Sequence, residues 1–359
     1  LLQKLLADDG VIFISIDDTE CSNLILICNE IFGASNFVAN VSWQRTYSPR
    51  NDSKGIVSEV EHLVVFSKNP GWQPNKLPRT EAMDSRYKNP DNDVAPWKSS
   101  DAFAPGAATH QGMVYAIQHP FTGEMLYPSN GRCWRYQQSS MLEYMQGWCN
   151  YRLENLHDEK ERARVCGIDE SAVRKDVLAI VLEEPLEVSA AKAQKVYNRG
   201  RWPGFYFTKG GYGGIARKTY LENVGGRLPT NLWMYEETGH TDEAKKELIS
   251  LFGGRSPFDT PKPTRLLDFV LKVAGTSETL MLDSFAGSGT TAHAVLNANK
   301  ADNGNRHFIL IEMMDYADSI TAERVKRAIK GYGEGKNAVE GTGGNFSFYD
   351  LGEPLLVGD

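Results

Sequence analysis

A glycine turn between a short apolar strand and a helix constrains this chain more than any other feature. The mostly apolar residues 279–282 predict a buried parallel strand, which continues into 283–291, Asp-Ser-Phe-Ala-Gly-Ser-Gly-Thr-Thr. The next segment, 292–298, predicts a helix, and a second apolar strand over 307–311 ends at Glu312. A strand, tight turn and helix in this order present backbone N–H groups and a helix N-terminus to a ligand. An acid at the tip of the second strand suits the hydroxyl groups of a ribose.

The glycine pattern alone leaves several nucleotide ligands open. Gly287, Gly289 and Ala292 also fit the dinucleotide fingerprint of dehydrogenases, whereas no Gly-Lys-Ser/Thr follows the turn, which excludes a P-loop. Only about 70 residues follow the turn, too few for the remaining strands of a full dinucleotide domain. A nicotinamide-dependent oxidoreductase is therefore a rival interpretation but a weaker one.

A Pro-Lys-Pro segment upstream separates these possibilities. Residues 258–263, Phe-Asp-Thr-Pro-Lys-Pro, precede an amphipathic helix predicted over 264–274. With this pairing the chain resembles the amino-group DNA methyltransferases of the β arrangement, in which the cofactor motif lies C-terminal to the catalytic half. The nearest resemblance is to the modification subunits of type III restriction systems and related adenine-N6 methyltransferases. The string 284–294 carries it most specifically, and 9–20, 32–37, 89–93, 96–98 and 131–135 extend it over nearly the whole chain.

The resemblance implies a set of residues that bind S-adenosylmethionine (AdoMet). Asp283 would lie beside the methionine part, Glu312 would hold the ribose, and Phe285 would pack on the cofactor. The full expected set is Thr260, Lys262, Pro263, Asp283, Phe285, Gly287, Gly289, Thr290, Thr291 and Glu312. Simpler roles remain open: Thr290 as a helix N-cap, Phe285 as a core residue and Lys262 as a solvated turn residue.

The chain departs from the family in one place. The family carries its chemistry on an Asp-Pro-Pro-Tyr or Asn-Pro-Pro-Tyr loop, and neither tetrapeptide occurs among the 359 residues. Because that loop lies N-terminal to the matched segment in the family, and because Leu1 is not a start methionine, we expect a fragment that begins after its own catalytic loop. No catalytic residue is therefore assigned.

Composition sets the remaining limits. Hydrophobic residues make up 41%, enough for a full core, and no apolar run approaches the ~20 residues of a membrane span. The five cysteines include no Cys-x-x-Cys pair, which favours reduced thiols in the cytoplasm and argues against zinc. The acidic turn at 17–20 could be taken for a metal cluster, but capping of the next helix is the simpler expectation. His62 and His293 are expected to pack rather than to catalyse, and we predict no metal site.

One stretch departs from the overall net charge of −7. Between Lys192 and Arg227 the chain carries eight basic residues and one acid, Glu222, with seven aromatic residues and several glycines interleaved. This composition is typical of contact with nucleic-acid phosphates and bases, although an ordinary surface hairpin would also explain it. The expected DNA-binding residues are Lys192, Lys195, Arg199, Arg201, Trp202, Lys209, Arg217 and Lys218.

These features predict an α/β chain with a Rossmann-like AdoMet-dependent methyltransferase sheet and a long α+β insertion. Residues 1–69 and 256–359 would form the methyltransferase domain, and 70–255 the target-recognition insertion. Within the insertion, 139–166 and 171–182 are expected to be helical.

The expected function is site-specific methylation of adenine N6 in double-stranded DNA, within a restriction-modification system. Two alternatives stay open: an inactive module that only binds DNA and AdoMet, and a cytosine-N4 methyltransferase. The resemblance further implies a homodimer and a helicase-nuclease restriction subunit as partners, and nothing implies a membrane.

Overall fold

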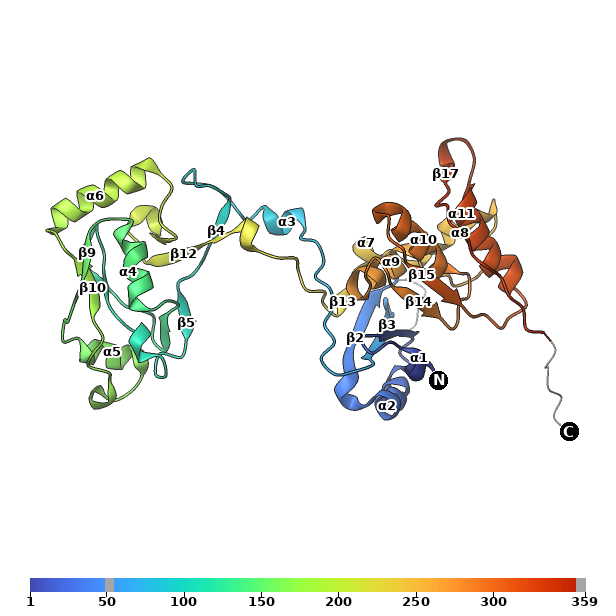
Figure 1. Ribbon diagram of the computed structural model, residues 1–359, viewed down its shortest axis with the longest axis horizontal. Helices are drawn as coiled ribbons and strands as arrows, with labels where there is room; N and C mark the ends of the chain where they lie inside the picture. Colours follow the sequence, from blue (N-terminus) through green and yellow to red (C-terminus); the bar gives the residue numbers. More distant parts are fainter. Residues whose placement is uncertain (49–54, 353–359) are drawn as a thin grey trace. The chain divides into compact units, whose positions relative to one another are not determined.

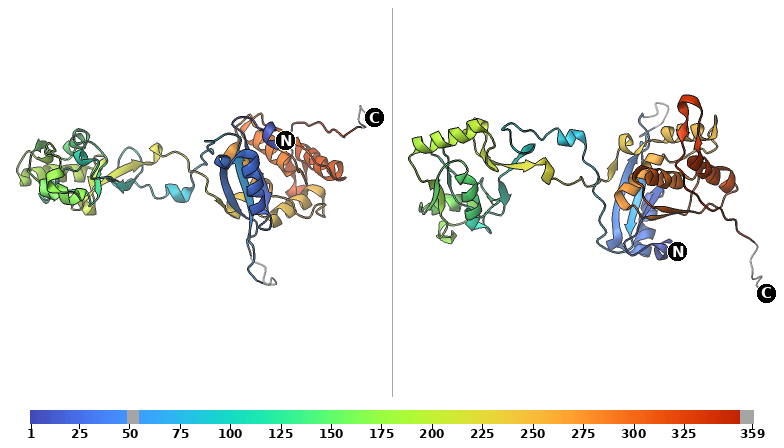
Figure 2. Two further views of the ribbon diagram at one scale, coloured as in Figure 1. Left: turned by 90° about the horizontal axis from the view of Figure 1, so that it is seen from below. Right: turned by 45° about the horizontal axis from the view of Figure 1, so that its top comes forward.

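The computed structural model describes residues 1–48 and 55–352. It divides into two compact units, one formed by Leu1–Pro78 with Arg227–Asp359 and the other by Arg79–Gly226. The first unit therefore combines both ends of the sequence. Figures 1 and 2 show its blue N-terminal strands beside its orange C-terminal helices.

The first unit alternates strands and helices. Its strands are β1 (Val11–Ile16), β2 (Phe37–Gln44), β3 (Val60–Ser67), β13 (Leu232–Trp233), β14 (Leu280–Asp283), β15 (His307–Leu310), β16 (Gly331–Tyr332) and β17 (Val339–Glu340). Its helices are α1 (Leu2–Leu5), α2 (Cys21–Phe32), η1 (Ala34–Asn36), α7 (Tyr235–Thr238), α8 (Thr241–Phe252), α9 (Thr264–Ala274), α10 (Thr290–Asp302), η6 (Ala317–Ala322), α11 (Glu323–Lys330) and η7 (Gly335–Asn337).

A four-stranded sheet in the order β1-β3-β2-β13 forms the N-terminal part of this unit. The first three strands pair antiparallel, and β13 joins β2 in parallel. Successive side chains of β3 pack on opposite faces of the sheet. Leu63 and Val65 pack with the apolar stripe of α9, whereas Val64 and Phe66 pack with α2. The expected helix at 264–274 is confirmed to the residue, and it covers this sheet because its apolar residues recur every three to four positions.

A parallel pair of strands carries the glycine turn. Leu280 to Asp283 of β14 lie in register with His307 to Leu310 of β15, and α10 connects the two strands. Helix α10 packs against α9 through Val295 and Leu271 and against α11 through Leu296 and Val325. The predicted strand-turn-helix-strand order is confirmed.

The second unit is built from shorter elements. Its strands are β4 (Trp97–Asp101), β5 (Phe103–Pro105), β6 (Ile117–Gln118), β7 (Met125–Leu126), β8 (Arg132–Trp134), β9 (Tyr151–Glu154), β10 (Ala179–Leu182), β11 (Phe205–Phe207) and β12 (Ile215–Tyr220). Its helices are α3 (Glu81–Asp84), η2 (Gln111–Met113), α4 (Gln138–Gln146), α5 (Glu159–Cys166), η3 (Glu170–Ala172), α6 (Leu186–Arg199), η4 (Lys209–Gly211) and η5 (Leu221–Asn223).

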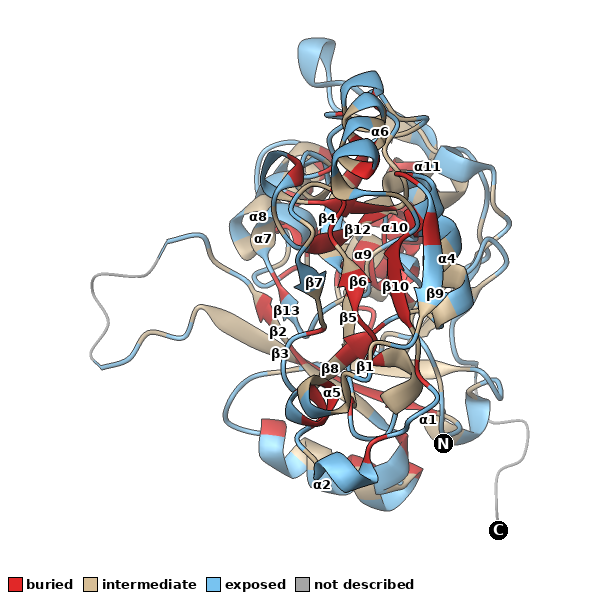
Figure 3. Ribbon diagram, turned by 90° about the vertical axis from the view of Figure 1, so that its left-hand side faces the viewer, coloured by how far each residue is buried: buried red, intermediate tan, exposed pale blue. Residues whose placement is uncertain are grey.

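Three small sheets share an aromatic core in the second unit. Their strand orders are β7-β6-β10-β9, β11-β12-β4 and β5-β8. Trp134, Trp148, Phe205 and Phe207 are almost completely buried among them. Figure 3 colours β10 as buried, whereas only Ser189 and Ala193 are buried in α6.

The helical expectation for part of this unit was wrong. Residues 139–166 form two helices separated by strand β9, and 171–182 ends in strand β10 instead of a helix. The sequence of β10, Ala-Ile-Val-Leu, is buried at every position and pairs with strands on both sides. Such a fully buried apolar run carries no periodicity that separates a strand from a helix.

The chain leaves the first unit and returns to it beside one pair of backbone hydrogen bonds. The Leu77 N–H donates to the Arg227 carbonyl at 2.8 Å, and the Arg227 N–H donates back at 2.9 Å. Residues 70–78 and 227–255, which the sequence placed in the insertion, belong to the first unit by their contacts. Across residues 1–48 and 55–352, no helix combines the length and the apolar character needed to cross a bilayer.

Candidate functional site

The glycine turn follows β14 directly and ends where α10 begins. Gly287 and Gly289 have φ angles of +52° and +77°, which residues with side chains rarely adopt. A Cβ at Gly289 would lie 2.9 Å from the Thr321 carbonyl oxygen. The turn thus requires glycine for its own conformation, and the first turn of α10 leaves N–H groups without partners in the helix.

Two carboxylates from the ends of the parallel strands hold the turn. Asp283 accepts a hydrogen bond from the Thr291 hydroxyl at 2.5 Å and one from the Phe285 N–H at 3.2 Å. Glu312 reaches back from the end of β15 and accepts from the Gly287 N–H at 2.8 Å. The parallel pairing therefore brings together two acids that lie 29 residues apart in the sequence.

Exposed apolar side chains lie beside these acids. The side chain of Phe285 follows Asp283 and is 82% exposed, and Met313, next to Glu312, is 86% exposed. The core-packing alternative for Phe285 is therefore wrong. A large aromatic group left in solvent next to two carboxylates is suited to cover the apolar part of a ligand.

The threonines at the start of α10 are buried rather than capping. Gly289 occupies the N-cap, without a side-chain hydrogen bond to the helix, so the N-cap alternative for Thr290 is wrong. The Thr290 hydroxyl instead donates to the Lys262 carbonyl at 3.2 Å. This bond ties the glycine turn to the Pro-Lys-Pro segment, two motifs that the sequence analysis treated separately.

The Pro-Lys-Pro segment is fixed by its own contacts. Lys262 forms an ion pair with Glu61 of β3, and its ammonium lies 5.1 Å from the centre of the Trp43 ring. Pro263 is the N-cap residue of α9, and Thr260 is exposed. Lys262 is thus a paired, partly buried residue rather than a solvated one, and its ammonium is already engaged within the protein.

A buried arginine beneath the turn was not predicted. Arg324 of α11 is completely buried and donates to the hydroxyl groups of Ser288 and Thr290. His293 lies beside it, and burial, followed by the charge of Arg324, lowers the pKa of His293 to about 4. The sequence carried no signal for Arg324 beyond its place in a helix with buried Val325 and Ala328, because a single basic residue in a charged helix normally faces solvent.

His62 and the acidic turn form a separate polar cluster. The His62 ring lies 2.8 Å from an Asp18 oxygen and 3.1 Å from the Asn40 side-chain oxygen. Hydrogen bonds from His62 and then from Ser58 lower the pKa of Asp18. Asp17 accepts from the Thr19 N–H, whereas Glu20, the N-cap of α2, makes no side-chain cap. No three His, Cys, Asp or Glu side chains gather as a metal site in the described part of the chain.

In the second unit the basic-aromatic stretch divides into exposed and buried residues. Lys195, Arg199, Arg201 and Lys209 are exposed. Lys192 pairs with Glu184 at 2.5 Å, and Arg217 is half-buried in β12. The exposed residues are therefore the ones free to meet phosphate groups.

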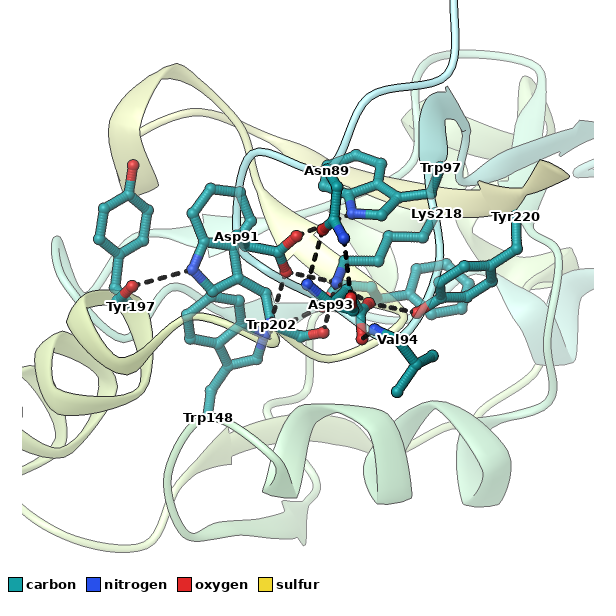
Figure 4. A network of polar contacts seen from close by, with 11 residues as sticks. Asn89, Asp91, Asp93, Val94, Trp97, Trp148, Tyr197, Trp202, Lys218 and Tyr220 are labelled. Carbon is teal, nitrogen blue, oxygen red and sulfur yellow. Dashed lines mark hydrogen bonds and ion pairs between the residues drawn. The ribbon is translucent and has the colours of Figure 1, made fainter. Parts of the chain in front are cut away.

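Trp202 and Lys218 belong to an interior network (Figure 4). Trp202 is half-buried, and its ring stacks on that of Tyr197 with centroids 4.8 Å apart. The Lys218 side chain has no exposed surface. Its ammonium donates to Asp91 at 2.5 Å, to Asp93 and to the Trp202 carbonyl at 2.7 Å. All three of its N–H donors are thus used inside the unit, which corrects the expectation that Lys218 contacts DNA.

Comparison with known proteins decides the family. A family model described as DNA methylase matches residues 1–323. The chain belongs to this family of DNA methylases. The resemblance to the amino-group DNA methyltransferases and type III modification subunits is confirmed.

Several curated relatives lie in restriction-modification systems. The Mod subunit of the type III enzyme StyLTI from Salmonella typhimurium is 31% identical over 86% of this chain and 38% of the relative. The Mod subunit of EcoPI from Escherichia phage P1 is 27% identical over 87% of this chain and 43% of the relative. The type II methyltransferase M.KpnI from Klebsiella pneumoniae is 27% identical over 86% of this chain and 63% of the relative. The methylase chain thus matches less than two thirds of the length of each of these relatives.

Proposed function

We propose that this chain binds AdoMet and double-stranded DNA and serves the methylation of adenine N6 in a restriction-modification system. One observation carries the proposal: Asp283 and Glu312 both accept hydrogen bonds from backbone N–H groups of the same glycine turn, beside the exposed Phe285. A carboxylate pair, free helix N–H groups and an aromatic surface match the hydroxyl, carboxylate and apolar groups of AdoMet. The parallel pair β14–β15 with its connecting α10 is in turn the unit from which a Rossmann-like sheet is built.

The residues of the turn would divide the work of binding. Glu312 would accept hydrogen bonds from the ribose, and Asp283 from the amino group of the methionine part. The N–H groups at the start of α10 would face the carboxylate, and Phe285 would cover the bound ligand. When bound, AdoMet would supply an electrophilic methyl group on a sulfonium sulfur. Lys262, whose ammonium is paired with Glu61, would contribute through its backbone and through the placing of Pro263.

The second unit is proposed as the target-recognition region. Its exposed cations, Lys195, Arg199, Arg201 and Lys209, would contact DNA phosphates, and Lys192 and Arg217 would contribute after modest rearrangement. Trp202 would support this surface from within. A base must leave the duplex before its amino group can be methylated, which costs a few kcal/mol of unpairing and unstacking.

Calorimetry with AdoMet tests the cofactor site. We expect the chain to bind AdoMet and not NAD, and the double variant Asp283→Ala/Glu312→Ala to lose AdoMet binding. Glu340→Ala is the matched control, because the Glu340 carboxylate is exposed and, among the residues that the structure describes, its ion-pair partner is Lys300. Absence of AdoMet binding by the unaltered chain, or unchanged affinity in the double variant, would contradict the proposal.

Nucleoside mass spectrometry of DNA incubated with AdoMet tests the reaction. We expect N6-methyladenine to be the methylated base. N4-methylcytosine instead would keep the mechanism and change the base. Binding of both ligands without any methylated base would favour the module that only binds DNA and AdoMet.

The proposed partners are a second copy of the chain and a helicase-nuclease restriction subunit. The restriction subunit is inferred from the type III relatives, whose names describe Mod subunits of restriction-modification enzymes, and the second copy from the family resemblance alone. Light scattering with and without DNA measures the first, and co-purification with the product of a neighbouring gene measures the second.

A further inference from the structure

A fully buried positive charge lies directly beneath the proposed cofactor site. The Arg324 guanidinium donates to Ser288 Oγ at 3.1 Å and to Thr290 Oγ1 at 2.8 Å, both in or next to the glycine turn. Its other terminal nitrogen donates to Thr264 Oγ1 at 3.1 Å, one residue after the Pro-Lys-Pro segment. One side chain thus connects the two motifs that the proposed function assigns to AdoMet.

The charge of Arg324 is balanced from a third element. Glu247 of α8 approaches the guanidinium to 3.2 Å and also accepts hydrogen bonds from the hydroxyl and the N–H of Thr264. His293 completes the cluster from α10 and lies 3.4 Å from Arg324 and 3.5 Å from Glu247. Since His293 is neutral near pH 7, one arginine and one glutamate carry the formal charges of the cluster.

An arginine is suited to this place by its shape. The planar guanidinium offers five N–H donors in a fixed fork, so it can hold the two motifs at once and at a fixed separation. A lysine offers one nitrogen on a flexible stem and cannot span the same acceptors. Arg324 has no exposed surface, so it cannot touch a ligand itself.

We propose that Arg324, balanced by Glu247, is a positioning residue that holds the glycine turn against the Pro-Lys-Pro segment so that the start of α10 receives the methionine part of AdoMet. This inference rests on the proposed AdoMet site and adds that different residues of the site recognise the amino-acid part and the nucleoside part of the ligand. Arg324 acts on the side of the pocket formed by Ser288 and Thr290, whereas the ribose is left to Glu312. Loss of Arg324 should therefore weaken recognition of the amino-acid part and spare recognition of the nucleoside.

Two ligands and two pairs of substitutions test this division. The variant Arg324→Met/Glu247→Met removes both charges together, because leaving one buried charge unpaired would destabilise the fold. The matched control is Arg327→Met/Glu323→Met, which removes a neighbouring, more exposed pair of the same helix α11. The ligands are AdoMet and 5′-methylthioadenosine, which keeps the nucleoside and lacks the amino-acid part. Calorimetry gives both affinities, and circular dichroism confirms folding.

We expect the Arg324→Met/Glu247→Met variant to bind AdoMet on the order of 10- to 100-fold more weakly, with 5′-methylthioadenosine unchanged. The control variant should bind both ligands as the unaltered chain does. Equal losses for both ligands would reduce Arg324 to a general structural role, and no loss for either would also overturn the inference. If the double variant does not fold, the single variant Arg324→Lys, which keeps the positive charge, is measured with the same two ligands and judged in the same way. Failure of the unaltered chain to bind AdoMet would instead refute the proposed function.

Discussion

Replacement of Lys218 by methionine separates a buried structural charge from a DNA contact. The Lys218 ammonium is enclosed by Asp91, Asp93 and the Trp202 carbonyl and lies 4.9 Å from the centre of the Trp97 ring. The side chains of the two acids are 0% and 8% exposed. Removing one partner of a buried ion pair leaves uncompensated charge, which costs about 3–5 kcal/mol. We expect Lys218→Met to lower the free energy of unfolding of the second unit by this amount.

Urea unfolding followed by tryptophan fluorescence measures this loss. Four of the seven tryptophans lie in the second unit, and Trp97 and Trp202 contact the network itself. With a urea dependence of about 2 kcal/mol per M, the transition that they report should move down by roughly 2 M. The matched control is Lys209→Met, an exposed cation of the same stretch, which should change stability by less than about 0.5 kcal/mol.

DNA affinity should respond in the opposite way. Lys209→Met should weaken DNA binding and reduce its salt dependence by about one phosphate contact, whereas folded Lys218→Met should bind as the unaltered chain does. A Lys218→Met variant with unchanged unfolding and a reduced salt dependence would refute the reasoning and restore Lys218 to the DNA surface. The triple variant with Asp91→Asn and Asp93→Asn should recover part of the lost stability, because it removes the unpaired charges.

Three further predictions concern the glycine turn and the helix α10 that follows it. Gly289→Ala should destabilise the first unit by about 1–3 kcal/mol in thermal unfolding, because its φ of +77° and the Thr321 carbonyl at 2.9 Å both oppose a Cβ; unchanged stability would show that the turn relaxes freely. Phe285→Ala should leave the unfolding temperature unchanged and weaken AdoMet binding in calorimetry, since its ring is 82% exposed; a large loss of stability would place the ring in the core. The pKa of His293 is about 4 in the folded protein against an ordinary value of 6.5, so the unfolded chain binds the proton first as pH falls. Stability should therefore drop by up to roughly 3 kcal/mol between pH 6.5 and 4, and His293→Gln should flatten this part of the pH profile.

The sequence predicted the parts of the fold that local pattern determines. The helix at Thr264–Ala274 is confirmed because apolar spacing and end signals agree there. The glycine turn was located for the same reason, as Gly287 and Gly289 permit a backbone that few residues adopt. The strand Ala179–Leu182 was missed because a short buried apolar run has no distinctive period.

The pairing of charges could not be predicted from sequence. Lys218 and Arg324 are ordinary basic residues in the chain, and the carboxylates that balance them, Asp91 and Glu247, lie 127 and 77 positions away. Which of the many cations become buried is settled by tertiary packing alone. The expected DNA-binding set therefore mixed exposed residues such as Lys209 with an interior one, and the cofactor set omitted the arginine that connects its two motifs.

The bridge between Leu77 and Arg227 has a consequence for how such a chain can diverge. Because the polypeptide departs and returns at adjacent, hydrogen-bonded residues, the ends of the intervening 79–226 segment are already closed. A segment whose two ends are already close together can be replaced by one of different length without distorting the unit to which it is joined. The reason is that the entropic cost of closing a loop rises only slowly with its length. Under the proposed function, the segment that recognises DNA can thus be exchanged in evolution while the part that binds AdoMet stays the same.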